Sequence, residues 1–216
     1  MNKNIVSNET IENDVVLRSI VEELKNKYHC HTVILYGSRA RGDYTPTSDY
    51  DVAGISQSSE KHRIARFDPL HNVYHDIFIY SENDFSTLQE EYLNMSDGKV
   101  IIEANNFGKN LLNQLKHFEP ALISENEIQT RKVWYKKMAA RAAVGDIEGK
   151  YRHIWAIFAI LEDYFVFRAM RYEGPKKAFQ YLEQHDPKTL ALFNKALNNM
   201  QDVEILNKLI ASIVNE

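Results

Sequence analysis

The chain reads VILYGSRARG at residues 33–42 and SDYDVAG at residues 48–54, and these two stretches decide the fold. The apolar, partly β-branched run at 33–36 predicts a buried strand, and the Gly-Ser after it predicts a turn. Gly37 lets backbone N–H groups approach an anion closely, and Ser38 can cap a helical turn or donate its hydroxyl to a phosphate oxygen. The pattern therefore predicts a strand that ends in a phosphate-sized turn.

Three acidic residues follow this turn. Asp49 and Asp51 alternate with other side chains, so a strand would put both carboxylates on one face, and Asp76 lies in the middle of the strand-like run VYHDIFIY at 73–80. Like charges at this spacing repel each other unless a cation joins them, and an unpaired carboxylate is costly to bury. Mg²⁺ binds through a few carboxylates together with substrate phosphates and water. The sequence therefore predicts a metal-nucleotide site.

At these residues the chain resembles the nucleotidyltransferase superfamily with the DNA polymerase beta type of fold, and within it the small bacterial members. The family pattern is an apolar strand that ends in Gly-Ser, then about ten residues, an Asp-x-Asp with apolar neighbours, and a third Asp on a later strand. The resemblance covers roughly residues 30–105 and takes in Arg39, Arg41 and Ser48. It implies a transferase that moves a nucleoside monophosphate, AMP from ATP or the equivalent from another nucleoside triphosphate, to a hydroxyl of a small molecule.

The resemblance also implies roles for the site residues. Asp49 and Asp51 would bridge two Mg²⁺ ions, and Asp76 would hold the ion nearest the acceptor. Gly37 and Ser38 would bind the β- and γ-phosphates. The expected nucleotide-binding set also includes Arg39, Arg41 and Ser48. Either arginine could equally be an ordinary surface charge.

Composition excludes some other classes of protein. The 216 residues are 44% hydrophobic and 26% charged, with a net charge of −4 and no long basic stripe, which argues against a nucleic-acid partner. The chain has one cysteine and begins with a polar segment, so we expect a cytoplasmic protein. Its longest apolar run, at 154–167, is interrupted by two acids and predicts a buried helix, not a membrane span. Either a monomer or a homodimer fits these data.

The pattern along the chain predicts an α+β fold with two domains. An N-terminal nucleotidyltransferase domain at 1–120 would hold a mixed β-sheet flanked by helices, and a helical bundle would occupy 121–216. We expect a loop or short helix at 56–70, either a solvated connection or a phosphate-contacting segment. Strands are expected at 32–36, 49–56, 73–80 and 99–103, and helices at 10–28, 82–94, 107–118, 124–144, 147–172, 176–185, 187–198 and 203–214.

The helical half carries a second resemblance. The run FRAMRYEGPK at 167–176 is similar to the helical tail of two-domain bacterial nucleotidyltransferases, a group that includes antibiotic-modifying enzymes. An antibiotic is therefore one candidate acceptor. The general base would be Asp76 itself or an acid of the bundle, Glu162 or Asp163, because each of these two interrupts an apolar helix. The alternative is that one or both acids cap a helix or pair with an arginine.

Two other functions compete with small-molecule transfer. One is a protein-modifying, AMPylating enzyme of the minimal antitoxin type, although those proteins are usually short single domains and the attached bundle argues against it. The other is a non-catalytic nucleotide-binding module, which would be favoured by loss of an acid. All three acids of the pattern are present in this chain.

Overall fold

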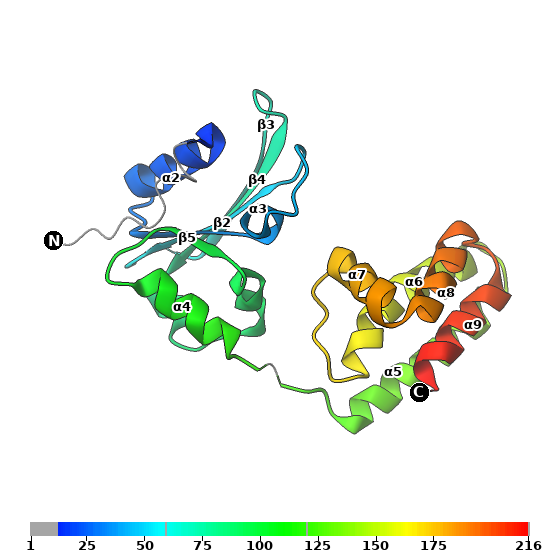
Figure 1. The fold of residues 1–216 in the computed structure, drawn as a ribbon. Helices are drawn as coiled ribbons and strands as arrows, with labels where there is room; N and C mark the ends of the chain where they lie inside the picture. The colour runs from blue at the N-terminus through cyan, green and yellow to red at the C-terminus, as the bar shows by residue number, and fades with distance from the viewer. Residues whose placement is uncertain (1–12, 59, 120, 216) are drawn as a thin grey trace. The chain divides into compact units, whose positions relative to one another are not determined.

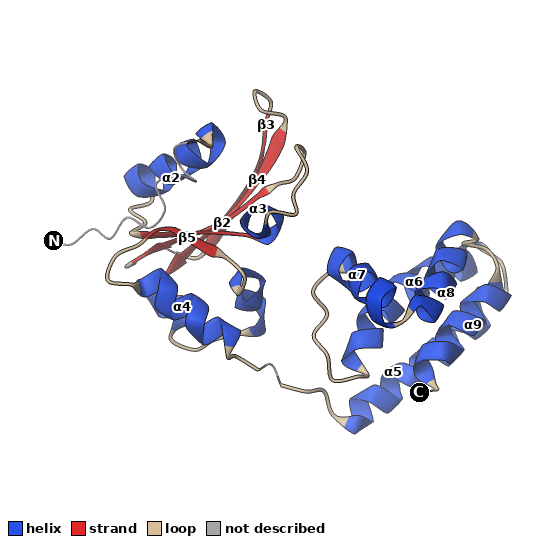
Figure 2. Ribbon diagram, in the orientation of Figure 1, coloured by secondary structure: helices blue, strands red, loops and turns tan. Residues whose placement is uncertain are grey.

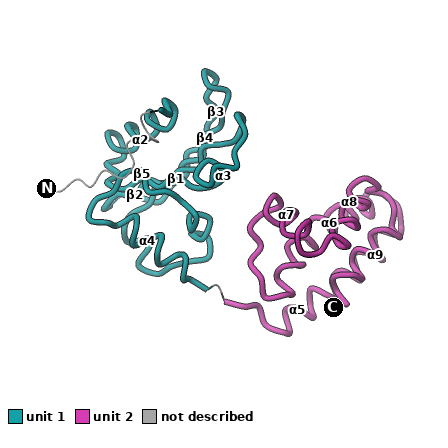
Figure 3. The backbone as a smooth tube through the Cα atoms, in the orientation of Figure 1, with its two compact units in different colours: residues 1–120 teal, residues 121–216 magenta. Residues whose placement is uncertain are grey.

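The computed structural model describes residues 13–58, 60–119 and 121–215. The chain divides into two compact units, Met1–Pro120 and Ala121–Glu216 (Figure 3). The strands that the structure describes all lie in the first unit, and the second contains helices and their connections (Figure 2). The predicted α+β class is confirmed.

The first unit contains a five-stranded mixed sheet in the order β3-β4-β2-β1-β5. Strand β1 (Thr32–Tyr36) is antiparallel to both β2 (Tyr50–Ser56) and β5 (Lys99–Ile102). Strand β2 is parallel to β4 (Val73–Ser81). This parallel pair matters for the site because it aligns the starts of two strands that both carry an aspartate.

The prediction of a loop or short helix at 56–70 was wrong, because an edge strand occupies the middle of this segment. Strand β3 (His62–Asp68) pairs antiparallel with β4. Most of its side chains are exposed, so it lacks the alternation of apolar and polar residues that reveals a half-buried strand. Its backbone hydrogen bonds to β4, which no local pattern encodes, decide its conformation.

The predicted helix at 82–94 was also wrong in type. Two 3₁₀ helices occupy this segment, η1 (Glu82–Phe85) and η2 (Glu90–Met95). A reciprocal capping box between Ser81 and Asp84 starts the first, and the Ser86 N–H closes it with a bond to the Asn83 carbonyl.

Helices cover both faces of the sheet (Figure 1). Helix α2 (Val15–Lys27) begins at an Asp14 cap and packs on one face; residues 10–12 of the helix predicted there lie outside the described part of the chain. Helix α4 (Phe107–Lys116) packs on the other face together with η1 and η2. The apolar side chains that join α4, η1 and η2 to this second face include Ile34, Ala53, Ile55, Tyr80, Phe85, Tyr92, Leu111 and Leu115.

The second unit contains five helices among its described residues. They are α5 (Glu125–Ala142), α6 (Ile147–Val166), α7 (Pro175–His185), α8 (Pro187–Asn198) and α9 (Val203–Val214). Their shared core includes Tyr135, Ile160, Leu182, Phe193 and Leu206. No helix in the described ranges combines the length and the apolar character that crossing a membrane requires.

Helix α6 differs from the prediction in two ways. It ends at Val166 instead of near 172, because Ala169 adopts a left-handed conformation (φ 55°) and the Met170 N–H bonds back to the Phe165 carbonyl. It is also not buried all round, since Tyr151 and Phe158 are 64% and 60% exposed. Its apolar residues are therefore divided between a core face and an open face.

Candidate active site

Three strands align the residues of the candidate site in one row. Tyr36 on β1 is the register partner of Asp51 on β2, and Asp51 is the register partner of Asp76 on β4. Residues that are opposite each other in a sheet project from the same face, so the two carboxylates are neighbours. Both are half-buried, whereas Asp49 lies just before β2 and is exposed.

The turn after β1 packs directly against Asp51. Gly37 has a φ of 69°, and a Cβ atom built on it would overlap the Oδ2 atom of the Asp51 carboxylate. A short helix, α3 (Gly37–Arg41), starts here and ends at Gly42, whose N–H bonds to the Ser38 carbonyl. Glycine is therefore required at 37 for two reasons, its backbone angle and the close approach of a carboxylate.

A Gly37→Ala variant separates these two reasons when it is compared with Gly42→Ala. Gly42 also has a positive φ, 90°, but a Cβ there would have no atom within 4 Å. Both variants should lose about 1 kcal/mol from backbone strain, and Gly37→Ala should lose about 1 to 2 kcal/mol more through the displaced carboxylate. Urea denaturation measures the difference. Equal losses in the two variants would contradict the packing of Gly37 on Asp51.

The surroundings of Asp51 change the acidity of its carboxyl group. Burial first, and then the negative charges of Asp49 and Asp76, raise its pKa to about 6, although Arg41 and Arg39 partly offset them. The repulsion shows that all three acids act on the same small region. A carboxylate held against two like charges favours a bound cation.

This raised pKa predicts a pH-dependent stability of the metal-free protein. Between about pH 4 and pH 6 the folded state holds a proton on Asp51 that the unfolded state has released, so the free energy of unfolding falls as pH rises through this window. We expect a loss of about 1 to 2 kcal/mol, which is less than the whole shift implies because the side chain is partly solvated. Urea denaturation in EDTA at pH 4.5 and 7.5 tests this. The loss should be absent from Asp51→Asn, and an equal loss in that variant would assign it to other groups.

Asp76 has a partner that the sequence did not predict as a site residue. Arg63 on β3 donates from Nε to Oδ1 at 2.6 Å and from a terminal nitrogen to Oδ2 at 2.7 Å. The sequence placed Arg63 in a segment beside the site but gave it no specific contact. Knowing that β3 pairs with β4 in this register would have identified Arg63 as a partner of Asp76.

The other predicted nucleotide-binding side chains contact protein groups in this structure. Arg39 donates to the Ser48 carbonyl at 2.8 Å and lies 3.8 Å from the Tyr50 ring centroid, so it anchors the loop before β2. Arg41 forms ion pairs with Asp97 and Asp43. The Ser48 hydroxyl accepts the Thr45 N–H. Their contact with a nucleotide stays a prediction.

The two candidate bases of the helical unit have different surroundings. Asp163 is buried and accepts hydrogen bonds from Arg131 and from the Tyr135 hydroxyl, each at 2.7 Å. Glu162 is exposed. The contacts of Asp163 are those of a structural acid paired with an arginine on another helix.

The site residues suit a hard divalent cation, although the ligands do not yet converge. Among residues 13–58, 60–119 and 121–215, no three histidine, cysteine or acidic side chains are already arranged to hold a metal ion. Both oxygens of Asp76 are occupied by Arg63. Oxygen donors crowded by like charge are nevertheless the chemistry that Mg²⁺ prefers. The donor set fits, and the Arg63 guanidinium is a positive charge already paired with one member of it.

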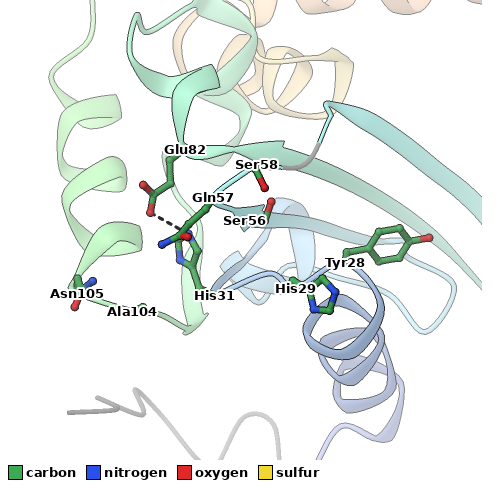
Figure 4. A pocket seen from close by; sticks show the side chains of 9 residues that line it. All are labelled: Tyr28, His29, His31, Ser56, Gln57, Ser58, Glu82, Ala104 and Asn105. Atoms are coloured by element: carbon green, nitrogen blue, oxygen red, sulfur yellow. Dashed lines mark ion pairs between the residues drawn. The ribbon is translucent and has the colours of Figure 1, made fainter. Parts of the chain in front are cut away.

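A separate pocket of about 280 Å³ lies at the other end of the same strands. His31 precedes β1, Ser56 ends β2 and Glu82 follows β4, whereas the acidic row lies where β1 ends and β2 begins. Figure 4 shows the ion pair across this pocket, in which His31 Nε2 lies 3.0 Å from Glu82 Oε1. The pocket is therefore distinct from the acidic site.

Comparison with known protein families gives a match over a large part of the chain. The model of the nucleotidyltransferase domain family matches residues 17–170, more than half of the chain, from α2 through α6. The chain belongs to this family. Membership supports a nucleotidyl-transfer activity and a place among the transferases.

The individual relatives add little to this assignment. A solved structure of a nucleotidyltransferase-like protein from Exiguobacterium sibiricum 255-15 is 12% identical; the alignment covers 92% of this chain and 73% of that one with a TM-score of 0.43, too low to carry an argument about the site. No curated protein matches the chain.

Proposed function

We propose that this protein is a Mg²⁺-dependent nucleotidyltransferase that moves AMP from ATP to a hydroxyl group of a small molecule, with antibiotics among the candidate acceptors. One observation carries the proposal. In a chain of this family, Asp51 and Asp76 are neighbours across parallel strands, and Gly37 packs against the first of them.

The reaction is an in-line displacement at phosphorus. The acceptor oxygen forms a bond to the α-phosphorus of ATP, the bond from that phosphorus to the β-phosphate bridging oxygen breaks, and pyrophosphate leaves. When bound, Mg²⁺ neutralises phosphate charge and lowers the pKa of the acceptor hydroxyl. Asp49, Asp51 and Asp76 would hold two such ions, while the Gly37 N–H and the Ser38 hydroxyl would orient the β- and γ-phosphates.

The acceptor proton needs a base. Asp76 is the candidate within the acidic row, and Glu162 or Asp163 is the candidate from the helical unit. The two hydrogen bonds that Asp163 accepts favour a structural role for it. We therefore assign proton acceptance to Asp76 ahead of the bundle acids.

Turnover of ATP labelled at the α-phosphate tests the proposal. The purified protein is incubated with Mg²⁺ and a panel of hydroxylated acceptors, including aminoglycoside and lincosamide antibiotics, sugars and nucleosides. We expect labelled acceptor and released pyrophosphate, both abolished by EDTA. Label on a polypeptide would favour the protein-modifying alternative, and nucleotide binding without pyrophosphate release would favour the non-catalytic module.

A further inference from the structure

We propose that Arg63 is the internal counter-ion of the metal site: it holds Asp76 in the metal-free protein and competes there with a divalent ion. Arg63 thereby lowers the metal affinity of the site. This inference rests on the proposed function, because it concerns the ion that the acidic row would bind.

The register of the sheet shows that this contact is built into the fold. On β3 and β4, Ala65 is the partner of Asp76, and Arg63 is the partner of Phe78. Arg63 therefore reaches diagonally along the face to Asp76, and its guanidinium carbon lies 5.2 Å from the Phe78 ring centroid. The alanine opposite Asp76 leaves room for this reach. The ring gives the guanidinium a surface to stack on.

The geometry makes the arginine and the metal competitors for one carboxylate. The guanidinium fork takes one acceptor position on each oxygen of Asp76, at 2.6 and 2.7 Å, and each oxygen keeps a second lone pair. A guanidinium and a divalent cation at the same carboxylate repel each other. The closed fork therefore disfavours metal binding through Asp76, and opening the fork removes this repulsion.

The Arg63 side chain is able to leave Asp76 because it extends from an exposed edge strand. Its side chain is 57% exposed, whereas that of Asp76 is 22% exposed. An exposed ion pair contributes only about 1 kcal/mol or less, so breaking it lowers metal affinity without preventing binding.

The other arginine of β3 provides a matched control. Arg66 pairs with Glu23 of helix α2 and hydrogen-bonds His75, on the opposite face of the sheet from Asp76. Arg66 carries the same charge as Arg63, lies on the same strand and forms a comparable ion pair. A general effect of removing positive charge from β3 would appear in both arginine variants.

The experiment measures Mn²⁺ binding by the loss of the free-ion electron paramagnetic resonance signal, without nucleotide. Arg63→Gln should bind Mn²⁺ about three- to fivefold more tightly than the wild-type protein, and Arg66→Gln should be within about twofold of it. Arg63→Lys keeps the charge but not the fork, so its affinity for Mn²⁺ should lie between those of Arg63→Gln and the wild-type protein. This variant keeps the test available if Arg63→Gln folds poorly.

Each outcome has a separate meaning. Measurable binding that is equal or weaker in Arg63→Gln overturns the counter-ion proposal alone. The absence of binding in all the proteins overturns it together with the proposed function.

Thermal unfolding gives a second readout. Arg63→Gln should have a lower melting temperature than the wild-type protein in EDTA, and saturating Mg²⁺ should remove this difference. A difference in melting temperature that persists in Mg²⁺ would assign Arg63 a purely structural role.

Discussion

An Asp51→Asn variant is expected to lose nucleotidyl transfer by at least about a thousandfold while keeping its fold. The amide has the shape of the carboxylate but not its charge, so it would not hold the divalent ions of the proposed mechanism. A thousandfold loss corresponds to about 4 kcal/mol of transition-state stabilisation, which is the order that metal-assisted charge neutralisation provides. Label transfer from ATP measures the activity, and Mn²⁺ titration measures the ion.

The fold should survive because Asp51 destabilises the metal-free protein. Its raised pKa means that the charged form is disfavoured by burial and by two neighbouring acids. Asp51→Asn should therefore be at least as stable as the wild-type protein in EDTA at pH 7.5. A variant that retained more than about a tenth of the activity would remove Asp51 from the metal ligands.

Asp68→Asn is the matched control for this variant. Asp68 is also an aspartate of the sheet, but it pairs in register with Val73 and its carboxylate accepts N–H groups of the turn at residues 70 and 71. The same chemical change there should leave transfer within about twofold of the wild-type rate. A large loss in both variants would indicate a general response to removed charge.

The strands that carry the candidate site have local signals. The apolar run at 33–36 and the alternation around Asp51 and Asp76 fix three strands, because each strand has a buried face that its own sequence reveals. The sequence predicted a mixed sheet, but the parallel pairing of β2 with β4 and its register, which sets Asp51 beside Asp76, come from the structure.

The contacts that were missed depend on distant pairing. Arg63 lies on an exposed edge strand, and its contact with Asp76 exists only because β3 folds back on β4 in one register. Pairing with an arginine was one of the alternatives for Asp163, but its actual partners could not be named, because they are about thirty residues away on another helix. Such pairs leave no periodic signal in the sequence.

An Asp163→Ala variant is expected to lower the free energy of unfolding of the helical unit by about 3 kcal/mol. The change leaves the buried Tyr135 hydroxyl without its acceptor and removes the buried partner of Arg131. Removing one member of a buried charged pair costs about 3 to 5 kcal/mol, and the partial exposure of Arg131 places this pair at the lower end. Both tryptophans of the chain, Trp134 and Trp155, are in α5 and α6, so fluorescence during urea denaturation reports on this unit directly.

Glu162→Ala is the control, and the pair of variants decides between a structural acid and a general base. Glu162 is the adjacent residue on the same helix but is exposed, so its removal should change stability by no more than about 0.5 kcal/mol. A structural Asp163 predicts that the more conservative Asp163→Asn keeps most of the activity, because the amide oxygen still accepts one of the two hydrogen bonds. A catalytic base predicts the reverse, with full stability and little transfer in Asp163→Asn. Full stability of Asp163→Ala would contradict the structural role and return this carboxylate to the candidate bases.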